Sequence, residues 1–173
     1  MEFTDEEMGQ AGVTKGHFTF QRQCLDNHNF LRREHGSVPL TWNADLAEEA
    51  QAWAERIADS GCLTYADIAD IGQNISFIPS SGPEDLVGGR EICELWAAER
   101  KFYDYMKPGW QSGTNHFTQM VWRASTELGC GRAYCSSRTA TVIVAFYRPP
   151  GNVNMPGEFQ ANVPTILSKR YLD

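Results

Sequence analysis

The segment GTNHFTQMVW, residues 113–122, places one histidine, His116, at the start of an apolar run that ends in a tryptophan. A run of this length fits one short helix or one buried strand. Asn115 stands where a helix-capping residue is expected, which favours the helix. LGCGRAYC (128–135) and TATVIVAFY (139–147) follow, with SSR between them. Their alternation predicts a β-hairpin.

Upstream of this segment the sequence has helical periodicity and clear helix ends. Asn43 can cap one helix and Gly61 can end it, while Gly88-Gly89 can either kink another helix or delay its start. Helices that precede a hairpin indicate an α+β fold in which helices cover an antiparallel sheet. The predicted elements are helices over 18–35, 43–61 and 83–105 and a short strand at 74–78. The Pro/Gly/Asn-rich segment 148–164 is long for a loop, so packing or function is expected to hold it in place.

Length and charge limit the classes of function. The chain has 173 residues and a net charge of −7. This length fits one domain, and the charge argues against nucleic acid or an anionic membrane as partner. No apolar run reaches the length of a transmembrane segment. We expect a flexible N-terminal tail at 1–16, one domain at 17–165 and a C-terminal tail at 166–173.

The longest motifs resemble a known family. GTNHFTQMVWRAS, LGCGRAYC, FYRPPGNVN (146–154) and the upstream segment 28–54 are similar to segments of the CAP superfamily, also called SCP/TAPS. That superfamily includes cysteine-rich secretory proteins, antigen 5 and pathogenesis-related proteins of group one. The resemblance covers about residues 18–163. It implies a three-layer α-β-α sandwich with a small antiparallel sheet between helices.

The resemblance also implies a central cavity. Many family members line it with two histidines and two acids, which in some cases hold a divalent cation. Here His116 and Glu99 match two of these positions, and Tyr65 and Gln73 stand at the other two. Zinc takes four ligands, or three and a water molecule, so two ligands predict at best a weak zinc site and no cofactor is expected. Tyr65 and Gln73 are instead expected to satisfy His116 and Glu99 through hydrogen bonds.

Two regions are candidates for an apolar ligand. The segment KFYDYMKPGW resembles the aromatic loop by which several CAP proteins bind sterols, although its rings could simply pack under the loop. Other relatives hold a fatty acid between two helices, and here the first and third helices, near Phe20, Leu31 and Ile92, could do so, although these three residues also fit a place in the core. The residues of the candidate sterol loop are Phe102, Tyr103, Tyr105, Pro108, Gly109 and Trp110.

The cysteines bear on the compartment. Cys130 and Cys135 would lie roughly 16 Å apart on one strand, too far for a disulfide. Resemblance to the plant members implies a Cys62–Cys135 bridge, which favours secretion. The remaining thiols of Cys24, Cys93 and Cys130 favour the alternative of a cytoplasmic or Golgi-associated protein. The acidic start of the chain lacks the features of a secretory signal, so secretion requires one that has been removed.

These observations predict a secreted, non-catalytic CAP protein that binds a sterol or a fatty acid, a protein receptor, or both. One alternative is a metal-dependent hydrolase built on His116 and Glu99, for which Ser112, Thr114 and Thr118 are nearby hydroxyls. No G-x-S-x-G motif supports it, and no catalytic residue is assigned. The other alternative is a pure protein-interaction module in immune modulation or defence. Assembly into a homodimer stays open.

Overall fold

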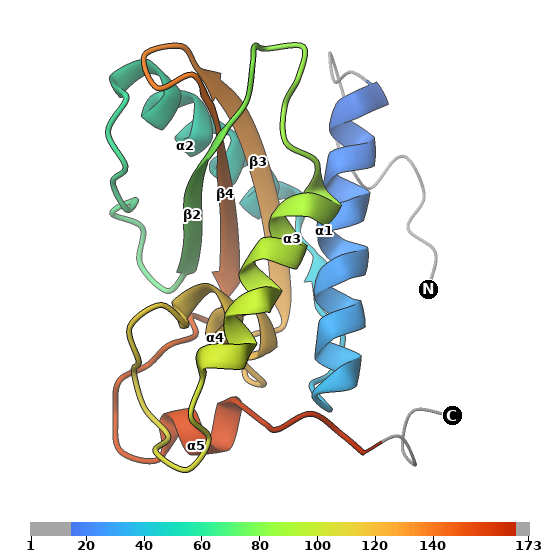
Figure 1. Ribbon diagram of the computed structural model, residues 1–173, viewed down its shortest axis with the longest axis vertical. Helices are drawn as coiled ribbons and strands as arrows, with labels where there is room; N and C mark the ends of the chain where they lie inside the picture. The colour runs from blue at the N-terminus through green and yellow to red at the C-terminus, as the bar shows by residue number, and fades with distance from the viewer. Residues whose placement is uncertain (1–14, 169–173) are drawn as a thin grey trace.

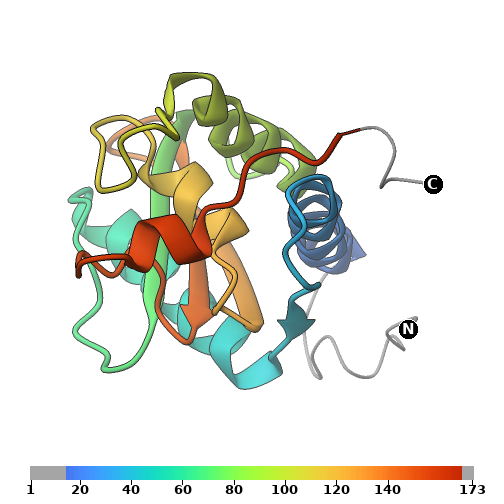
Figure 2. The ribbon, with the colours of Figure 1, turned by 90° about the horizontal axis from the view of Figure 1, so that it is seen from below.

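A four-stranded sheet, in the order β1-β3-β4-β2, separates two helical layers (Figures 1 and 2). The computed structural model describes residues 15–168. Helix α2 packs on β3 and β4 on one side, and α1 and α3 pack against each other on the other side. This is the predicted α-β-α sandwich. The elements are α1 (Lys15–Glu34), β1 (Thr41–Trp42), α2 (Ala44–Ser60), β2 (Gly72–Pro79), α3 (Gly89–Ala97), the 3-10 helix η1 (Ala98–Phe102), α4 (Asn115–Val121), β3 (Glu127–Cys135), β4 (Ala140–Arg148) and α5 (Glu158–Asn162).

The predicted hairpin forms the centre of the sheet. Strands β3 and β4 are antiparallel, with Leu128 opposite Tyr147 and Cys135 opposite Ala140. Strand β2 adds to the other edge of β4 in antiparallel orientation, and the two-residue β1 pairs with β3 in parallel. Residues 140–147 are all buried, as expected for a central strand that is covered by helices on both faces.

The two glycines of LGCGRAYC bring α2 onto the sheet. Gly129 and Gly131 lie two apart on β3, so they share one face of the strand. A Cβ atom at Gly129 would collide with the backbone of Ala47, and one at Gly131 with the backbone of Gln51. The motif therefore allows helix α2 to lie directly against the strand, where larger residues would hold it away.

The ends of α2 are those that the sequence predicts. The side chain of Asn43 accepts a hydrogen bond from the amide of Leu46 at 2.9 Å. Gly61 has φ 68°, the left-handed conformation that favours glycine, and its amide donates to the carbonyl of Ile57 at 2.8 Å.

The third helix differs from its prediction. It was expected over 83–105, but α3 begins at Gly89 and gives way to η1 after Ala97. Gly89 lies against α1, where a Cβ atom would collide with the carbonyl of Phe20, so α3 starts where the two helices touch. The short elements β1 and α5 were not predicted.

The structure describes only the inner ends of the two predicted tails. Residues 1–14 lie outside the described residues, and α1 already begins at Lys15. At the other end, the amide of Leu167 donates to the carbonyl of Glu34 at 2.8 Å, so the predicted C-terminal tail starts in contact with α1.

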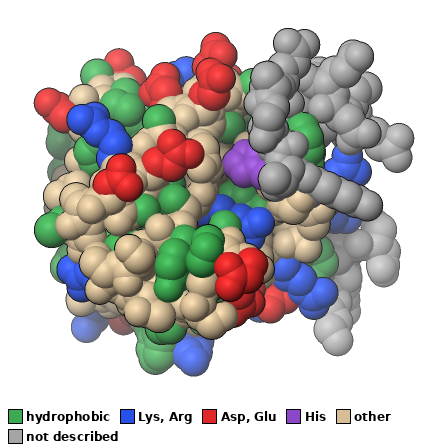
Figure 3. Space-filling view, turned by 90° about the horizontal axis from the view of Figure 1, so that it is seen from above, with side chains coloured by type: hydrophobic (Ala, Val, Ile, Leu, Met, Phe, Trp, Pro, Cys, Tyr) green, Lys and Arg blue, Asp and Glu red, His purple; other side chains and the backbone are tan. Residues whose placement is uncertain are grey.

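Within residues 15–168, no helix is long and apolar enough to cross a membrane. Acidic side chains are spread over the end of the molecule at which α1 begins (Figure 3).

Arg32 fixes the chain that follows α4. It is fully buried, and its guanidinium group donates to the carbonyls of Met120, Trp122 and Ser125 at 2.9 Å each. A fourth bond reaches Val38 at 2.7 Å. Burial lowers the pKa of Arg32 to about 10, so the group stays charged at neutral pH. Helix α4, which carries His116, is thereby anchored to α1.

Candidate functional site

His116 and Glu99 meet at the start of α4. The imidazole Nδ1 donates to Glu99 Oε2 at 2.7 Å. The other carboxylate oxygen, Oε1, accepts the backbone amides of His116 at 2.9 Å and Phe117 at 3.1 Å. The side chain of Thr114, at the N-cap position of α4, makes no capping hydrogen bond. Glu99, which lies in η1, caps the helix instead. Its negative charge also suits the positive end of the helix dipole.

The imidazole of His116 is held on a second side by Trp96. The two rings are stacked, with centroids 5.4 Å apart and an interplanar angle of 8°. Trp96 is fixed in turn, because its indole N–H donates to Ser76 Oγ at 2.9 Å. Nε2 of His116 has no hydrogen-bond partner in the part of the chain that the structure describes. The imidazole is therefore oriented by Glu99 and Trp96, with one nitrogen left open.

The two residues predicted to complete the cavity are not part of it. The side-chain amide of Gln73 makes two bonds of 2.8 Å with the backbone of Ala66. Tyr65 is exposed at 64%. The prediction that these residues satisfy His116 and Glu99 is wrong. Side chains alternate along β2, and Gln73 lies on the face of the sheet that α2 covers, beside Ile75.

The next residue, Asn74, joins the site instead. Its Nδ2 donates to the carbonyl of His116 and to the hydroxyl of Tyr147, both at 3.1 Å. The Tyr147 hydroxyl lies 2.6 Å from His28 Nε2, and His28 Nδ1 lies 2.7 Å from the carbonyl of Cys24. A carbonyl only accepts, so Nδ1 carries the proton and Nε2 accepts from Tyr147. Burial lowers the pKa of His28 to about 4, which keeps it neutral.

The chemistry of this arrangement is limited. No three His, Cys, Asp or Glu side chains within residues 15–168 are placed to hold a metal ion, so His116 and Glu99 offer two ligands. Tyr65 and Gln73 face elsewhere and do not fit as further ligands of a tetrahedral zinc. The hydroxyl of Thr114 donates to Gln111 and that of Thr118 to Asn152, both at 2.7 Å. Neither hydroxyl, nor that of Ser112, bonds to the imidazole.

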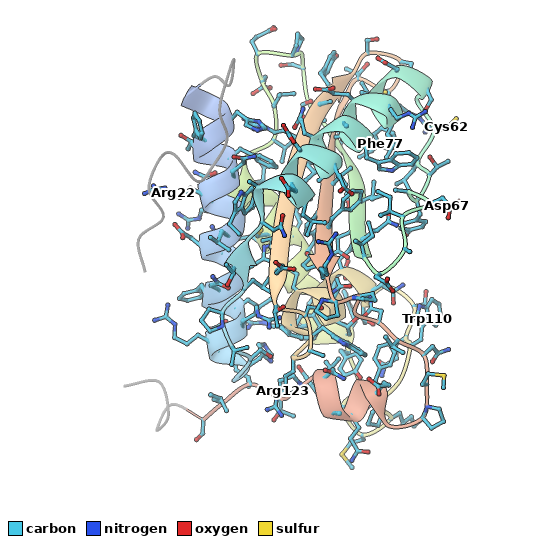
Figure 4. All side chains as sticks on the ribbon, turned by 180° about the vertical axis from the view of Figure 1, so that it is seen from behind. Arg22, Cys62, Asp67, Phe77, Trp110 and Arg123 are labelled. Carbon is cyan, nitrogen blue, oxygen red and sulfur yellow. The ribbon has the colours of Figure 1, made fainter. Side chains whose placement is uncertain are left out.

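The aromatic loop divides into buried and exposed rings. Phe102 and Trp110 are exposed, and Figure 4 shows Trp110 at the edge of the molecule. Tyr103 is buried and makes edge contacts with Tyr105, at 4.9 Å between centroids, and with Phe117, at 6.2 Å. Only part of the predicted sterol loop is therefore free to meet a ligand directly.

Two small pockets lie against this loop. One of about 180 Å³ is lined by Tyr103, Tyr105 and Pro108 together with residues 160–165. The other, of about 340 Å³, lies between Pro108-Gly109 and residues 154–160. Among the residues that the structure describes, the buried hydroxyl of Tyr103 has no partner at hydrogen-bonding geometry. Burial raises the pKa of Tyr103, and the backbone of Gly109 partly opposes this.

A groove of about 560 Å³ lies between α1 and α3. Leu31 lines it as predicted, whereas Phe20 and Ile92 are buried and do not. Two ion pairs lie at its rim, Arg100–Glu34 at 3.0 Å and Arg90–Glu94 at 2.8 Å. The lining residues are Asn27, Phe30, Leu31, Glu34, Arg90, Cys93, Glu94, Ala97, Ala98 and Arg100.

The predicted disulfide is not formed in the structure, where all five cysteines are free. Cys62 follows the left-handed Gly61 and is exposed at the edge of the molecule (Figure 4). Cys135 is buried, and its sulfur lies 3.4 Å from Ser137 Oγ. The two side chains thus occupy different surroundings, and their pairing stays a prediction.

Comparison with known proteins supports the fold and the site region together. Residues 25–147, which include the hairpin and His116, match the model of the cysteine-rich secretory protein family, CAP. The human Golgi-associated plant pathogenesis-related protein 1 is 35% identical over 144 residues, which is 83% of this chain and 92% of that protein. Pathogenesis-related protein 1A of Nicotiana tabacum is 33% identical over 134 residues, 76% of each chain.

The fold is also shared with a solved structure. That of Schistosoma mansoni venom allergen-like protein 4 covers 91% of this chain and 99% of its own, with 22% identity and a TM-score of 0.62. A family match over more than half of the chain and relatives of one-third identity agree with the sandwich and with the signature hairpin. The chain belongs to the cysteine-rich secretory protein (CAP) family.

Proposed function

We propose that this protein is a non-catalytic binder of small apolar ligands, and that a single-chain fatty acid lies in the groove between α1 and α3. The groove itself carries the proposal: its volume of about 560 Å³ lies in the range of small-molecule sites. Phe30, Leu31 and Ala97 supply apolar surface for an acyl chain. Arg90 and Arg100 at the rim can exchange their glutamate partners for a ligand carboxylate.

A sterol at the aromatic loop is the second candidate, and one observation favours it. Tyr103 lines a pocket, and within residues 15–168 its buried hydroxyl has only the backbone of Gly109 nearby and makes no hydrogen bond of good geometry. An unpaired buried hydroxyl costs free energy that the single hydroxyl of a sterol could recover. The pocket beside Tyr103, of about 180 Å³, is smaller than the groove, so the loop would have to move. The groove is therefore the better supported site.

The other parts of the proposal concern role and compartment. Relatives named pathogenesis-related proteins support a role in defence, in which a protein receptor would be a further partner. Secretion is supported by the family description, and a Golgi-associated location by the human relative's name. The hydrolase alternative has less support, because Thr114 and Thr118 direct their hydroxyls to partners other than His116.

Titration with a fluorescent fatty acid tests the groove. Ala97→Trp fills it and should abolish saturable binding. Phe30→Ala removes apolar contact of about 1.5 kcal/mol and should raise Kd about 10-fold. Leu95→Ala is the matched control, since Leu95 is an exposed apolar residue of α3 outside the groove lining.

Equal Kd values for the wild type and both groove variants would reject the groove. Labelled cholesterol in a parallel titration separates the second candidate. Saturable cholesterol uptake that Ala97→Trp leaves unchanged and Tyr103→Phe weakens would move the site to the aromatic loop.

A further inference from the structure

Three cysteines from three elements meet beneath the α1–α3 groove. They are Cys24 of α1, Cys93 of α3 and Cys130 of β3, and none is more than 1% exposed. The thiol of Cys24 interacts with the thiols of both others. The sulfur of Cys93 also lies 3.4 Å from His28 Nδ1 and 3.8 Å from the carbonyl of Cys24. We call Cys24, Cys93 and Cys130 the thiol cluster.

The helices that carry Cys24 and Cys93 approach each other closely. Gly89 lies one turn before Cys93, and a Cβ atom there would stand 3.0 Å from the sulfur of Cys24 and 2.9 Å from its amide nitrogen. Only a residue without a side chain fits between α3 and α1 at this point. A disulfide needs Cα atoms within about 7 Å of each other. The close approach of the helices at Gly89, and the 3.8 Å between the sulfur of Cys93 and the carbonyl of Cys24, bring the two residues side by side.

The three cysteines of the thiol cluster differ in whether they line the groove. Cys93 lines the groove, whereas Cys24 and Cys130 do not. Burial raises the pKa of Cys93 and of Cys130. Burial acts on Cys24 in the same direction, but the thiols of Cys130 and Cys93 and the charge of Arg132 outweigh it and lower the pKa of Cys24. In the thiol cluster, Cys93 therefore lies at the groove and Cys24, which has the lower pKa, lies behind it.

We propose that Cys24 and Cys93 form a site of oxidative modification, at which a hydroperoxide joins the two thiols in a disulfide that ties α1 to α3. The sulfur of Cys93 attacks one oxygen of hydrogen peroxide, the O–O bond breaks, and the thiol proton passes to the leaving hydroxide, which gives a sulfenic acid and one water molecule. The sulfur of Cys24 then attacks that of Cys93, the S–O bond breaks, and the oxygen leaves as a second water molecule. Two thiols are oxidised and one peroxide is reduced.

Cys130 is the competing partner for Cys24. Its thiol also interacts with that of Cys24. Cys130 is fully buried on β3 and does not line the groove, whereas Cys93 does. Entry through the groove selects Cys93. The bridge would fix both walls of the groove, and the inference does not depend on which ligand the groove binds.

Tryptic mapping can read each thiol separately. Cleavage after arginine places Cys24 in peptide 23–32, Cys93 in 91–100 and Cys130 in 124–132. The folded protein is treated with hydrogen peroxide, free thiols are alkylated under denaturing conditions, and the digest is analysed by mass spectrometry. Peptides 23–32 and 91–100 should appear joined, lighter by two hydrogen atoms than their sum. Reduction should separate them and lower the Tm of the oxidised protein.

Two variants and one internal control make the result decisive. Cys130→Ser should keep the joined pair, and Cys93→Ser should lose it. The exposed thiol of Cys62 reports that peroxide has reacted. If Cys62 is oxidised while 23–32 and 91–100 are both alkylated in the wild type, the proposal is wrong. A link between 23–32 and 124–132 would equally overturn the choice of Cys93, and neither result depends on a variant that must fold.

Discussion

At the scale of single residues, Glu99 has two structural tasks at once. One carboxylate oxygen orients the imidazole of His116, and the other accepts the amides of His116 and Phe117 at the start of α4. A carboxylate that looks like a metal ligand or a catalytic acid in the sequence is therefore also the cap of a helix. This accounts for its position without any bound cation.

Glu99→Ala should lower the free energy of unfolding by about 1–3 kcal/mol, because two buried amides and the imidazole lose their acceptor. Glu99→Gln keeps an amide acceptor and should cost less. Glu94→Ala is the control, since Glu94 pairs with Arg90 on the surface and such pairs contribute about 0–1 kcal/mol. Urea denaturation measures all three. A loss for Glu99→Ala no greater than for Glu94→Ala would contradict the capping role.

Two neighbouring residues of β2 show that the sequence alone does not predict which side chain faces His116. The pair His116 and Glu99 was predicted together and is found together. Gln73 was assigned to the same cavity, but Asn74 occupies it. A sequence motif can place a functional residue to within one position. Successive side chains of a strand lie on opposite faces of the sheet, so an error of one residue puts the side chain on the wrong face. Only the register of β2 against β4 decides which of the two faces His116.

At the scale of elements, contact between α2 and β3 depends on two glycines. Gly131→Ala should destabilise the protein by about 1–3 kcal/mol, because the new methyl group would meet the backbone of Gln51. Gly109→Ala is the matched control, with nothing within 4 Å of its Cβ position, and should change stability by less than about 0.5 kcal/mol. Thermal unfolding followed by circular dichroism compares them, and equal Tm values would remove the packing argument.

Local signals predicted some elements well and others poorly. Asn43 and Gly61 bound α2 in the sequence and in the structure, because capping bonds form within a few residues. Gly88-Gly89 indicated a delayed start of the third helix, and α3 does begin at Gly89, where a Cβ atom would collide with the carbonyl of Phe20. Tyr103 and Trp110 look alike in the loop sequence, yet packing against Phe117 buries only the first.

At the scale of the whole molecule, buried neutral histidines make stability depend on pH. Burial lowers the pKa of His28 to about 4 and also lowers those of His17 and His35. In the unfolded chain the pKa of histidine is near 6.5. Below that pH the unfolded state therefore binds protons that the buried histidines of the folded state do not bind, which favours unfolding. Stability should be full above pH 6.5 and fall as the pH approaches 4, by about 2–3 kcal/mol for His28.

Urea denaturation at pH 7 and pH 4.5 measures this dependence. His28→Gln should reduce the difference between the two pH values, since glutamine does not titrate. An unchanged difference in that variant would show that other groups cause the acid sensitivity.

The central claim is that the groove between α1 and α3 is the ligand site of this CAP protein. A crystal structure of the protein grown with a long-chain fatty acid tests it most directly. Electron density for an acyl chain is expected beside Phe30 and Ala97, with its carboxylate near Arg90 or Arg100. An empty groove, with density for the ligand against Tyr103 and Trp110 instead, would contradict it.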